Sequence, residues 1–159
     1  MTHSDSGNDA GGNDPGSRGD ARTSRPDDDS ADGRPTAYDL LGGEPVVRRI
    51  VDRFYELMDT DPDFFGIRKL HPDSLEGSRE KLFLFLCGWL GGPQYYARKY
   101  GHPMLRARHL PYAIASAERD QWLICMGRAM VDCGVSEPLI DRLLPAFFNT
   151  ADWMRNREG

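Results

Sequence analysis

The uneven distribution of large apolar side chains is the feature that most limits what this chain can fold into. Residues 1–35 contain no Val, Ile, Leu, Phe, Trp, Tyr or Cys and consist mainly of Asp, Gly, Ser, Asn, Arg and Pro. Such a segment buries too little apolar surface to offset the entropy lost on ordering, so we expect a disordered tail. Apart from Met1, every large apolar residue lies in residues 36–159, which are sufficient for one compact domain.

Charge is also divided unevenly between these two parts. The net charge of −5 is made up of −4 in residues 1–35 and −1 in residues 36–159. A domain with nearly balanced charge has no excess of cations to offer a phosphate backbone. A nucleic-acid partner is therefore not expected.

Three features indicate a cytoplasmic protein without a membrane span. The longest apolar run, residues 82–90, is far shorter than the roughly 20 residues that a span requires. Charged residues occupy the N-terminal region where a signal peptide has an apolar stretch. The cysteines show no CxxC spacing and lie in apolar surroundings, as buried reduced thiols do; they are Cys87, Cys125 and Cys133.

Helical periodicity, interrupted by glycine and proline, runs through residues 36–159. The spacing of apolar residues predicts four longer helices, over residues 45–60, 74–90, 116–133 and 136–153. Shorter helical turns are expected over residues 36–41, 93–100 and 104–110, and residues 63–72 are expected to form a loop or a single turn. Candidate N-caps are Thr36, Ser74, Ser116 and Ser136. Pro145 lies inside the last helix, where its ring predicts a kink.

The apolar run over residues 82–90 has a second interpretation as a buried strand, because periodicity alone does not separate the two. We favour a helix because Glu76, Arg79, Glu80 and Lys81 precede the run without a break and no partner strand is visible. The domain is therefore expected to be all-α.

His109 is the histidine whose surroundings point to chemistry. A lone histidine beside apolar residues is more often a hydrogen-bonded core residue than a ligand. A heme site, however, needs a neutral imidazole on a short rigid element, an apolar slot for the macrocycle and cations for two propionates. The sequence offers these around His109 in Leu105, Leu110 and Tyr112, in Arg106 and Arg108, and in Lys81 on a facing helix.

Other kinds of site have no support in the sequence. There is no HExxH, no EF-hand loop and no paired CxxC, so zinc and calcium sites are not expected. Gly42-Gly43 and Gly91-Gly92 follow predicted helices, where glycine terminates a helix rather than binding phosphate. Nothing places a cysteine beside a histidine base.

Five segments occur in the order seen in group II truncated hemoglobins, and the chain resembles that family over about residues 37–157. The segments are Arg53-Phe54-Tyr55, Gly91-Gly92-Pro93, Gly101-His102-Pro103, Arg106-Ala107-Arg108-His109-Leu110-Pro111-Tyr112 and Glu118-Arg119-Asp120-Gln121-Trp122. The segment over residues 146–157 is also similar to the last helix of bacterial members. The resemblance implies a two-over-two helical sandwich with heme b between its layers.

The resemblance also implies a role for individual residues. His109 matches the proximal iron ligand, Tyr55 the distal tyrosine, and Trp122 a tryptophan that overhangs the bound ligand. His71 matches a distal position usually held by Phe, Tyr or His, and Ser78 falls where myoglobins place the distal histidine, with Leu82 one turn on. Lys81 and His102 are similar to residues beside the propionates. Because Ser78 is small, stabilisation of the ligand falls to Tyr55, Trp122 and His71.

Without the resemblance, Tyr55 would be interpreted as half-buried with its hydroxyl at the surface, and Trp122 as core filling. With the resemblance, these residues are interpreted as hydrogen-bond donors to the heme ligand. Because iron-bound dioxygen carries partial negative charge, we expect it to be retained by the Tyr55 hydroxyl, the Trp122 indole N–H and an imidazole N–H of His71. The same groups suit peroxide cleavage, with His71 as an acid–base group.

Three hypotheses for function follow. The first is a binding protein that captures or delivers oxygen, nitric oxide or carbon monoxide at a five-coordinate iron. The second is an enzyme with peroxidase-like or nitric-oxide-oxidising activity that uses an external reductant. The third, a helical interaction domain without heme, leaves the matched spacing of Tyr55, His109 and Trp122 as coincidence. An absorption spectrum separates the third from the others.

Overall fold

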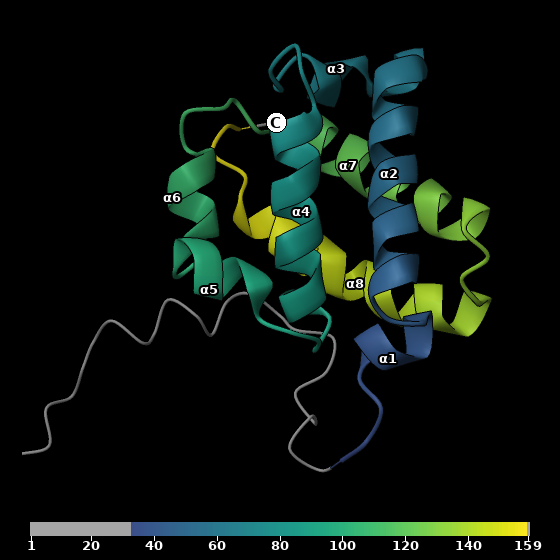
Figure 1. The fold of residues 1–159 in the computed structure, drawn as a ribbon. Coiled ribbons are helices and arrows are strands. Elements are labelled where there is room, and N and C mark those ends of the chain that lie inside the picture. Colours follow the sequence, from purple (N-terminus) through teal and green to yellow (C-terminus); the bar gives the residue numbers. More distant parts are fainter. Residues whose placement is uncertain (1–32, 159) are drawn as a thin grey trace, which may run out of the picture.

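The computed structural model describes residues 33–158 (Figure 1). Most of the predicted disordered tail, residues 1–32, lies outside the described residues. The elements are α1 (Ala37–Leu41), α2 (Glu44–Thr60), η3 (Pro62–Phe64), α3 (Phe65–Arg68), α4 (Glu76–Trp89), α5 (Tyr95–Tyr100), α6 (Leu105–His109), α7 (Ser116–Asp132) and α8 (Glu137–Trp153). Over residues 33–158 these helices occur without any strand, so the all-α prediction is confirmed and the strand interpretation of residues 82–90 was wrong.

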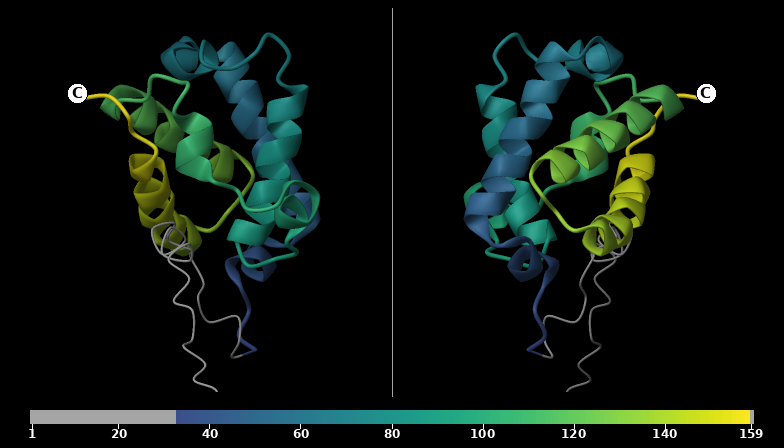
Figure 2. Two further views of the ribbon diagram at one scale, coloured as in Figure 1. Left: turned by 90° about the vertical axis from the view of Figure 1, so that its left-hand side faces the viewer. Right: turned by 90° about the vertical axis from the view of Figure 1, so that its right-hand side faces the viewer.

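The four longer helices form two layers (Figure 2). Helices α2 and α4 pack together in one layer, and α7 and α8 pack together in the other. The two layers meet where α2 packs against α7. The apolar face predicted for α2 is the face it buries, with Val47, Val51 and Phe54 fully enclosed. The thiol of Cys125 on α7 donates to the Phe54 carbonyl oxygen over 3.3 Å, which joins the layers at their centre. The two-over-two arrangement is thus confirmed.

Helix α1 begins as predicted at Thr36. The Thr36 hydroxyl oxygen accepts from the Asp39 N–H over 3.3 Å, and the Asp39 carboxylate accepts from the Thr36 N–H over 3.2 Å. This reciprocal pair is a capping box. The Tyr38 N–H donates to the Leu90 carbonyl over 2.9 Å, so α1 is hydrogen-bonded to the C-terminal end of α4. Gly91, at φ 96°, is needed here because a Cβ would lie 2.7 Å from the Thr36 Cβ.

Several predicted helix starts were wrong in detail. Ser74 does not cap α4, which begins two residues later; its hydroxyl accepts only a long bond of 3.4 Å from the Glu76 N–H. Ala115, not Ser116, occupies the N-cap of α7, where the Glu118 carboxylate accepts from the Ala115 N–H over 3.2 Å. Ser136 does hold the N-cap of α8, but without a side-chain hydrogen bond. At the start of α7 the N-cap N–H is thus bonded by an acidic side chain within the helix, Glu118.

Residues 62–68 form η3 and α3 in succession, whereas a loop or a single turn was expected over residues 63–72. The Asp61 carboxylate accepts from the Asp63 N–H over 2.9 Å and starts the first turn, with Pro62 in the position that favours a helix start. Phe64 and Ile67 are buried, but helices this short have no repeated apolar spacing to detect. Helix α8 continues through Pro145, and the kink expected there stays a prediction.

None of the helices in the described part of the chain combines the length and the apolar composition needed to cross a membrane.

Candidate functional site

His109 is the last residue of α6 and is half-buried. Its Nδ1 lies 2.6 Å from the Leu105 carbonyl oxygen. A carbonyl oxygen can only accept a hydrogen bond, so Nδ1 carries the proton and the neutral ring keeps a lone pair on Nε2. A backbone carbonyl that orients the second ring nitrogen is the usual arrangement for a histidine that binds a metal through Nε2.

Tyr55 is buried on α2, with only 4% of its surface exposed. Its hydroxyl donates to the Ser78 carbonyl oxygen on α4 over 3.2 Å, so the interpretation that places this hydroxyl at the surface was wrong. Burial raises the pKa of Tyr55, an effect that the nearby charge of Arg79 only partly opposes. The hydroxyl therefore keeps its proton at physiological pH and remains a hydrogen-bond donor.

Trp122 lies on α7 between two aromatic rings. Its ring centroid is 5.4 Å from that of Phe54 on α2 and 5.5 Å from that of Phe147 on α8. The ring thus fills part of the core, as the simpler interpretation proposed, while staying partly exposed. An indole N–H can only donate, so the polar edge of Trp122 offers a donor and nothing else.

His71 follows α3, and its ring meets the Tyr55 ring edge-on at 5.9 Å. Its Nδ1 lies 2.8 Å from the Ile67 carbonyl oxygen and therefore carries the proton of the neutral ring. Burial lowers the pKa of His71, the hydrogen bond to Ile67 opposes this, and the positive charge of Arg68 adds to the lowering. The neutral ring offers a lone pair on Nε2, in place of the N–H donor that the sequence led us to expect.

Gln121 is a residue of this region that the sequence analysis did not single out. Its Oε1 accepts from the Ile67 N–H over 3.1 Å, so the residue whose carbonyl orients His71 is itself held to α7. Gly66 makes this approach possible, because a Cβ there would lie 2.6 Å from both polar atoms of the Gln121 carboxamide. In the sequence, the only sign that Gln121 belongs to this region is its position next to Trp122 in a matched segment. That position does not predict a contact with Ile67.

We expect Gln121→Ala to lower the free energy of unfolding by about 1–3 kcal/mol, because it leaves the N–H of the buried Ile67 without its acceptor. Gln121→Glu is the matched control, since it keeps an oxygen at the Oε1 position. Urea unfolding of the three proteins measures the difference. Equal losses in both variants would mean that the hydrogen bond to Ile67 does not hold α3 in place.

The cations predicted for the propionates lie in two places. Lys81 on α4 and Arg108 on α6 both approach α5, where Lys81 Nζ lies 5.8 Å from the Tyr100 ring centroid and the Arg108 guanidinium 5.8 Å from that of Tyr96. Arg106 is directed elsewhere, because its Nη1 donates to the carbonyls of Trp153 and Arg155 over 2.7 and 2.9 Å.

The remaining predicted residues surround these groups. His102 is exposed between α5 and α6, and its Nδ1 accepts from the Met104 N–H over 3.2 Å. Tyr112 follows α6 and is 43% exposed. Ser78 contributes its carbonyl to Tyr55, and Leu82, one turn further along α4, packs against the core.

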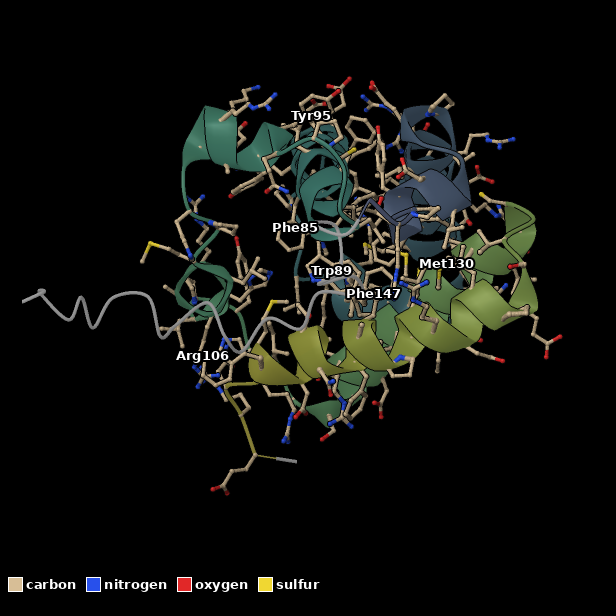
Figure 3. The ribbon with its side chains drawn as sticks, turned by 90° about the horizontal axis from the view of Figure 1, so that it is seen from below. Phe85, Trp89, Tyr95, Arg106, Met130 and Phe147 are labelled. Carbon is tan, nitrogen blue, oxygen red and sulfur yellow. The ribbon has the colours of Figure 1, made fainter. Side chains whose placement is uncertain are left out.

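An apolar aromatic surface lies between the layers. Viewed from below, Figure 3 shows Phe85 and Trp89 of α4 beside Phe147 of α8, with Arg106 of α6 set apart from them. Trp89 and Phe147 stack with their ring centroids 4.4 Å apart. The oriented imidazole of His109 is of the type that binds heme iron, and the cations Lys81 and Arg108 are of the type that pairs with heme propionates, so the residues present suit a heme.

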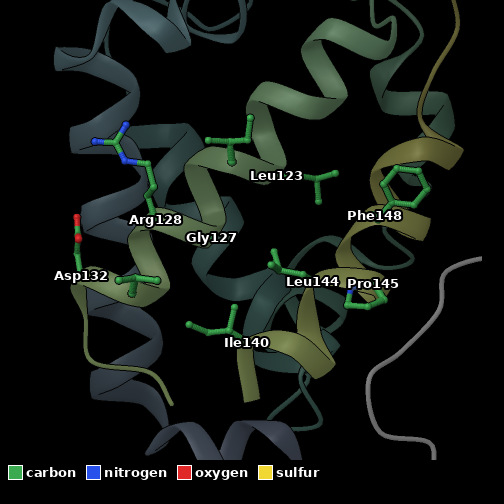
Figure 4. Close-up of a pocket in the computed structure, with 10 residues that line it drawn as sticks. Leu123, Gly127, Arg128, Asp132, Ile140, Leu144, Pro145 and Phe148 are labelled. Atoms are coloured by element: carbon green, nitrogen blue, oxygen red, sulfur yellow. The ribbon is translucent and has the colours of Figure 1, made fainter. Parts of the chain in front are cut away.

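A separate groove of about 610 Å³ lies on the outer face of α7 and α8 (Figure 4). Its lining includes Leu123, Gly127, Ile140 and Phe148, and none of the predicted site residues belongs to it. The charged side chains at its rim are already paired, Arg128 with Asp61 over 2.7 Å and Asp132 with Arg53 over 2.8 Å.

Two packed helical layers, a histidine whose ring is oriented by a backbone carbonyl and a tyrosine buried between α2 and α4 are together the features of a truncated globin. The chain belongs to the bacterial-like globin family, whose pattern matches residues 36–156. The predicted resemblance to group II truncated hemoglobins is thus confirmed, and heme is the cofactor of the family.

Relatives in this family cover most of the chain. The group 2 truncated hemoglobin YjbI of Bacillus subtilis is 37% identical over 120 residues, which are 76% of this chain and 88% of that protein. The solved structure of the group II 2-on-2 hemoglobin of Agrobacterium tumefaciens is 43% identical, with a TM-score of 0.74 over 78% of this chain and 95% of that one. The cold-adapted truncated hemoglobin of Pseudoalteromonas haloplanktis is 40% identical, with a TM-score of 0.74 over 77% and 98% of the two chains. Heme-based binding of a small ligand is the function common to such proteins.

Proposed function

We propose that this protein binds dioxygen or another diatomic gas reversibly at a five-coordinate heme iron, with His109 as the proximal ligand. The observation that carries the proposal is the 2.6 Å contact between His109 Nδ1 and the Leu105 carbonyl oxygen, which leaves Nε2 as a lone-pair donor of fixed direction. The heme, when bound, supplies the metal that forms the bond to the gas. Capture or delivery of oxygen within the cytoplasm is the role that we assign to it.

The distal groups divide into donors and an acceptor. Trp122 offers a fixed N–H, and Tyr55 offers a hydroxyl proton that its high pKa retains. The Tyr55 proton is directed at Ser78 in this structure, so rotation about the C–O bond is needed before it reaches a ligand. His71 offers its Nε2 lone pair, so it accepts a proton or a hydrogen bond from a protic ligand or from Tyr55.

The His71 acceptor favours one further activity, peroxidase-like turnover. A hydroperoxide gives up a proton when it is activated, and a neutral imidazole of lowered pKa is a suitable acceptor for that proton. Trp122 on the facing layer can donate to the other oxygen. Turnover then requires an external reductant, as does oxidation of nitric oxide by the oxygen-loaded protein.

Absorption spectra of the purified protein in the ferric, ferrous and carbon-monoxide forms test the proposal. We expect five-coordinate ferrous spectra that change on addition of carbon monoxide. The oxygen-loaded protein is then mixed with nitric oxide, and with hydrogen peroxide and a phenolic reductant, to compare the enzymatic alternatives. A protein that is purified without heme and does not take it up would contradict the proposal.

A further inference from the structure

The chain that follows α8 turns back and lies against α6 and the loop after it (Figure 1). The N–H groups of Asn156 and Arg157 both donate to the Ile114 carbonyl oxygen, over 2.9 and 3.1 Å. In return, the Asn156 Oδ1 accepts from the Ile114 N–H over 3.0 Å. The segment that follows α8 is thus paired with the loop that follows His109.

The Asn156 carboxamide reaches His109 itself. Its Nδ2 donates to the His109 carbonyl over 3.1 Å and to the Tyr112 carbonyl over 2.8 Å. The orientation of the carboxamide is determined by these partners, because only Oδ1 can accept from the Ile114 N–H and only Nδ2 can donate to two carbonyls. All three hydrogen bonds of the side chain are therefore made with residues 109–114.

Helix α6 needs restraints of this kind. It has five residues, none of them buried, and the side chain of its N-cap residue makes no capping hydrogen bond. Its N-cap residue, Met104, has a φ of 47°, a conformation that residues other than glycine rarely adopt. A helix this short has little stability of its own, and core packing does not hold this one.

A second contact joins the same two segments. The Arg106 Nη1 donates to the Trp153 and Arg155 carbonyls, and its guanidinium lies 5.2 Å from the Trp153 ring centroid. Arg106 therefore ties α6 to the end of α8 one turn before His109, while Asn156 ties down the His109 carbonyl. The two contacts fix successive parts of the same helix.

We propose that Asn156 is a positioning residue for the proximal histidine, and that the C-terminal segment over residues 153–157 is a clamp on α6. This inference rests on the proposed function, in which His109 binds the iron. The clamp sets the position of the His109 backbone and, through the rigid imidazole, the direction of the Nε2 lone pair. Movement of residues 154–157 alters the proximal bond without any contact to the ligand side of the heme.

Asn156→Ala tests the clamp in the full-length heme-loaded protein, and Asn149→Ala is the matched control, because Asn149 is exposed on α8. We expect amide hydrogen exchange over residues 105–114 to be about tenfold faster or more in Asn156→Ala, because three side-chain hydrogen bonds are lost. We also expect the iron–histidine Raman band to shift and broaden. Asn149→Ala is expected to resemble the parent protein in both measurements.

Asn156→Asp keeps the acceptor for the Ile114 N–H but replaces the donor to His109 and Tyr112 by an oxygen. It therefore separates docking of the segment from positioning of His109, and it serves if the alanine variant folds poorly. A shifted Raman band in this variant supports the clamp. Exchange and Raman bands equal to those of Asn149→Ala in both Asn156 variants would overturn it. An iron–histidine band that survives in His109→Ala would instead contradict the proximal assignment.

Discussion

The His109→Ala variant is expected to lose its heme. Removing the imidazole removes the Nε2 lone pair that the Leu105 carbonyl directs. In the proposed site this leaves the porphyrin with apolar contacts and with the cations proposed for its propionates, Lys81 and Arg108. Loss of a group that merely orients a metal ligand costs about 10- to 100-fold in metal affinity, so loss of the ligand itself is expected to exceed about 100-fold. The rate of heme dissociation is measured by mixing the protein with an excess of a heme-free acceptor protein and recording the absorbance change as heme is transferred.

His102→Ala provides the control for this experiment. His102 is exposed on the neighbouring loop. Its removal also deletes an imidazole, and it leaves in place the Arg106 and Asn156 hydrogen bonds that restrain α6. We expect this variant to keep an ordinary five-coordinate ferrous spectrum. If the two variants retain heme equally, and His109→Ala keeps the iron–histidine Raman band, His109 is not the ligand.

The long helices could be predicted because their evidence is local. Seventeen-residue helices such as α2 and α7 repeat their apolar spacing several times, and α2 in particular buries the residues that its spacing selects. The short elements η3 and α3 contain one buried residue each, which is too few to show a period. The starts of α4 and α7 were misplaced because a serine near a helix start is only one of several groups that can satisfy the first N–H groups.

The sequence was sufficient to propose the site residues, but it did not give their contacts or their tautomers. His71 was recognised from a matched position, whereas its tautomer depends on a contact with the Ile67 carbonyl. Gln121 reaches Ile67 across 54 positions of the sequence, and Asn156 reaches His109 across 47. Contacts over such separations leave no periodic pattern, and they became evident only once the two layers were assembled.

The Trp122→Phe variant is expected to release oxygen about ten- to a hundredfold faster. Bound dioxygen carries partial negative charge, and a hydrogen bond to a charged group contributes about 1.5–3 kcal/mol, which corresponds to that change in rate if the bond is lost on dissociation. Phenylalanine keeps an aromatic ring between Phe54 and Phe147 but removes the indole N–H. Tyr55→Phe is expected to have a smaller effect, because the Tyr55 proton is already donated to Ser78 and must be redirected to reach a ligand.

Carbon monoxide distinguishes hydrogen bonding from steric access in the same variants. It develops little negative charge when bound, so loss of a donor is expected to change its dissociation less than that of oxygen. Stopped-flow dissociation of both gases should be measured for Trp122→Phe, Tyr55→Phe and the double variant, because one donor can reorient when the other is removed. A double variant that exceeds the product of the single effects would show that Tyr55 turns from Ser78 toward the ligand when Trp122 no longer donates. Equal acceleration of both gases in all three variants would mean that these side chains control access to the pocket, and the distal hydrogen-bonding mechanism would then be wrong.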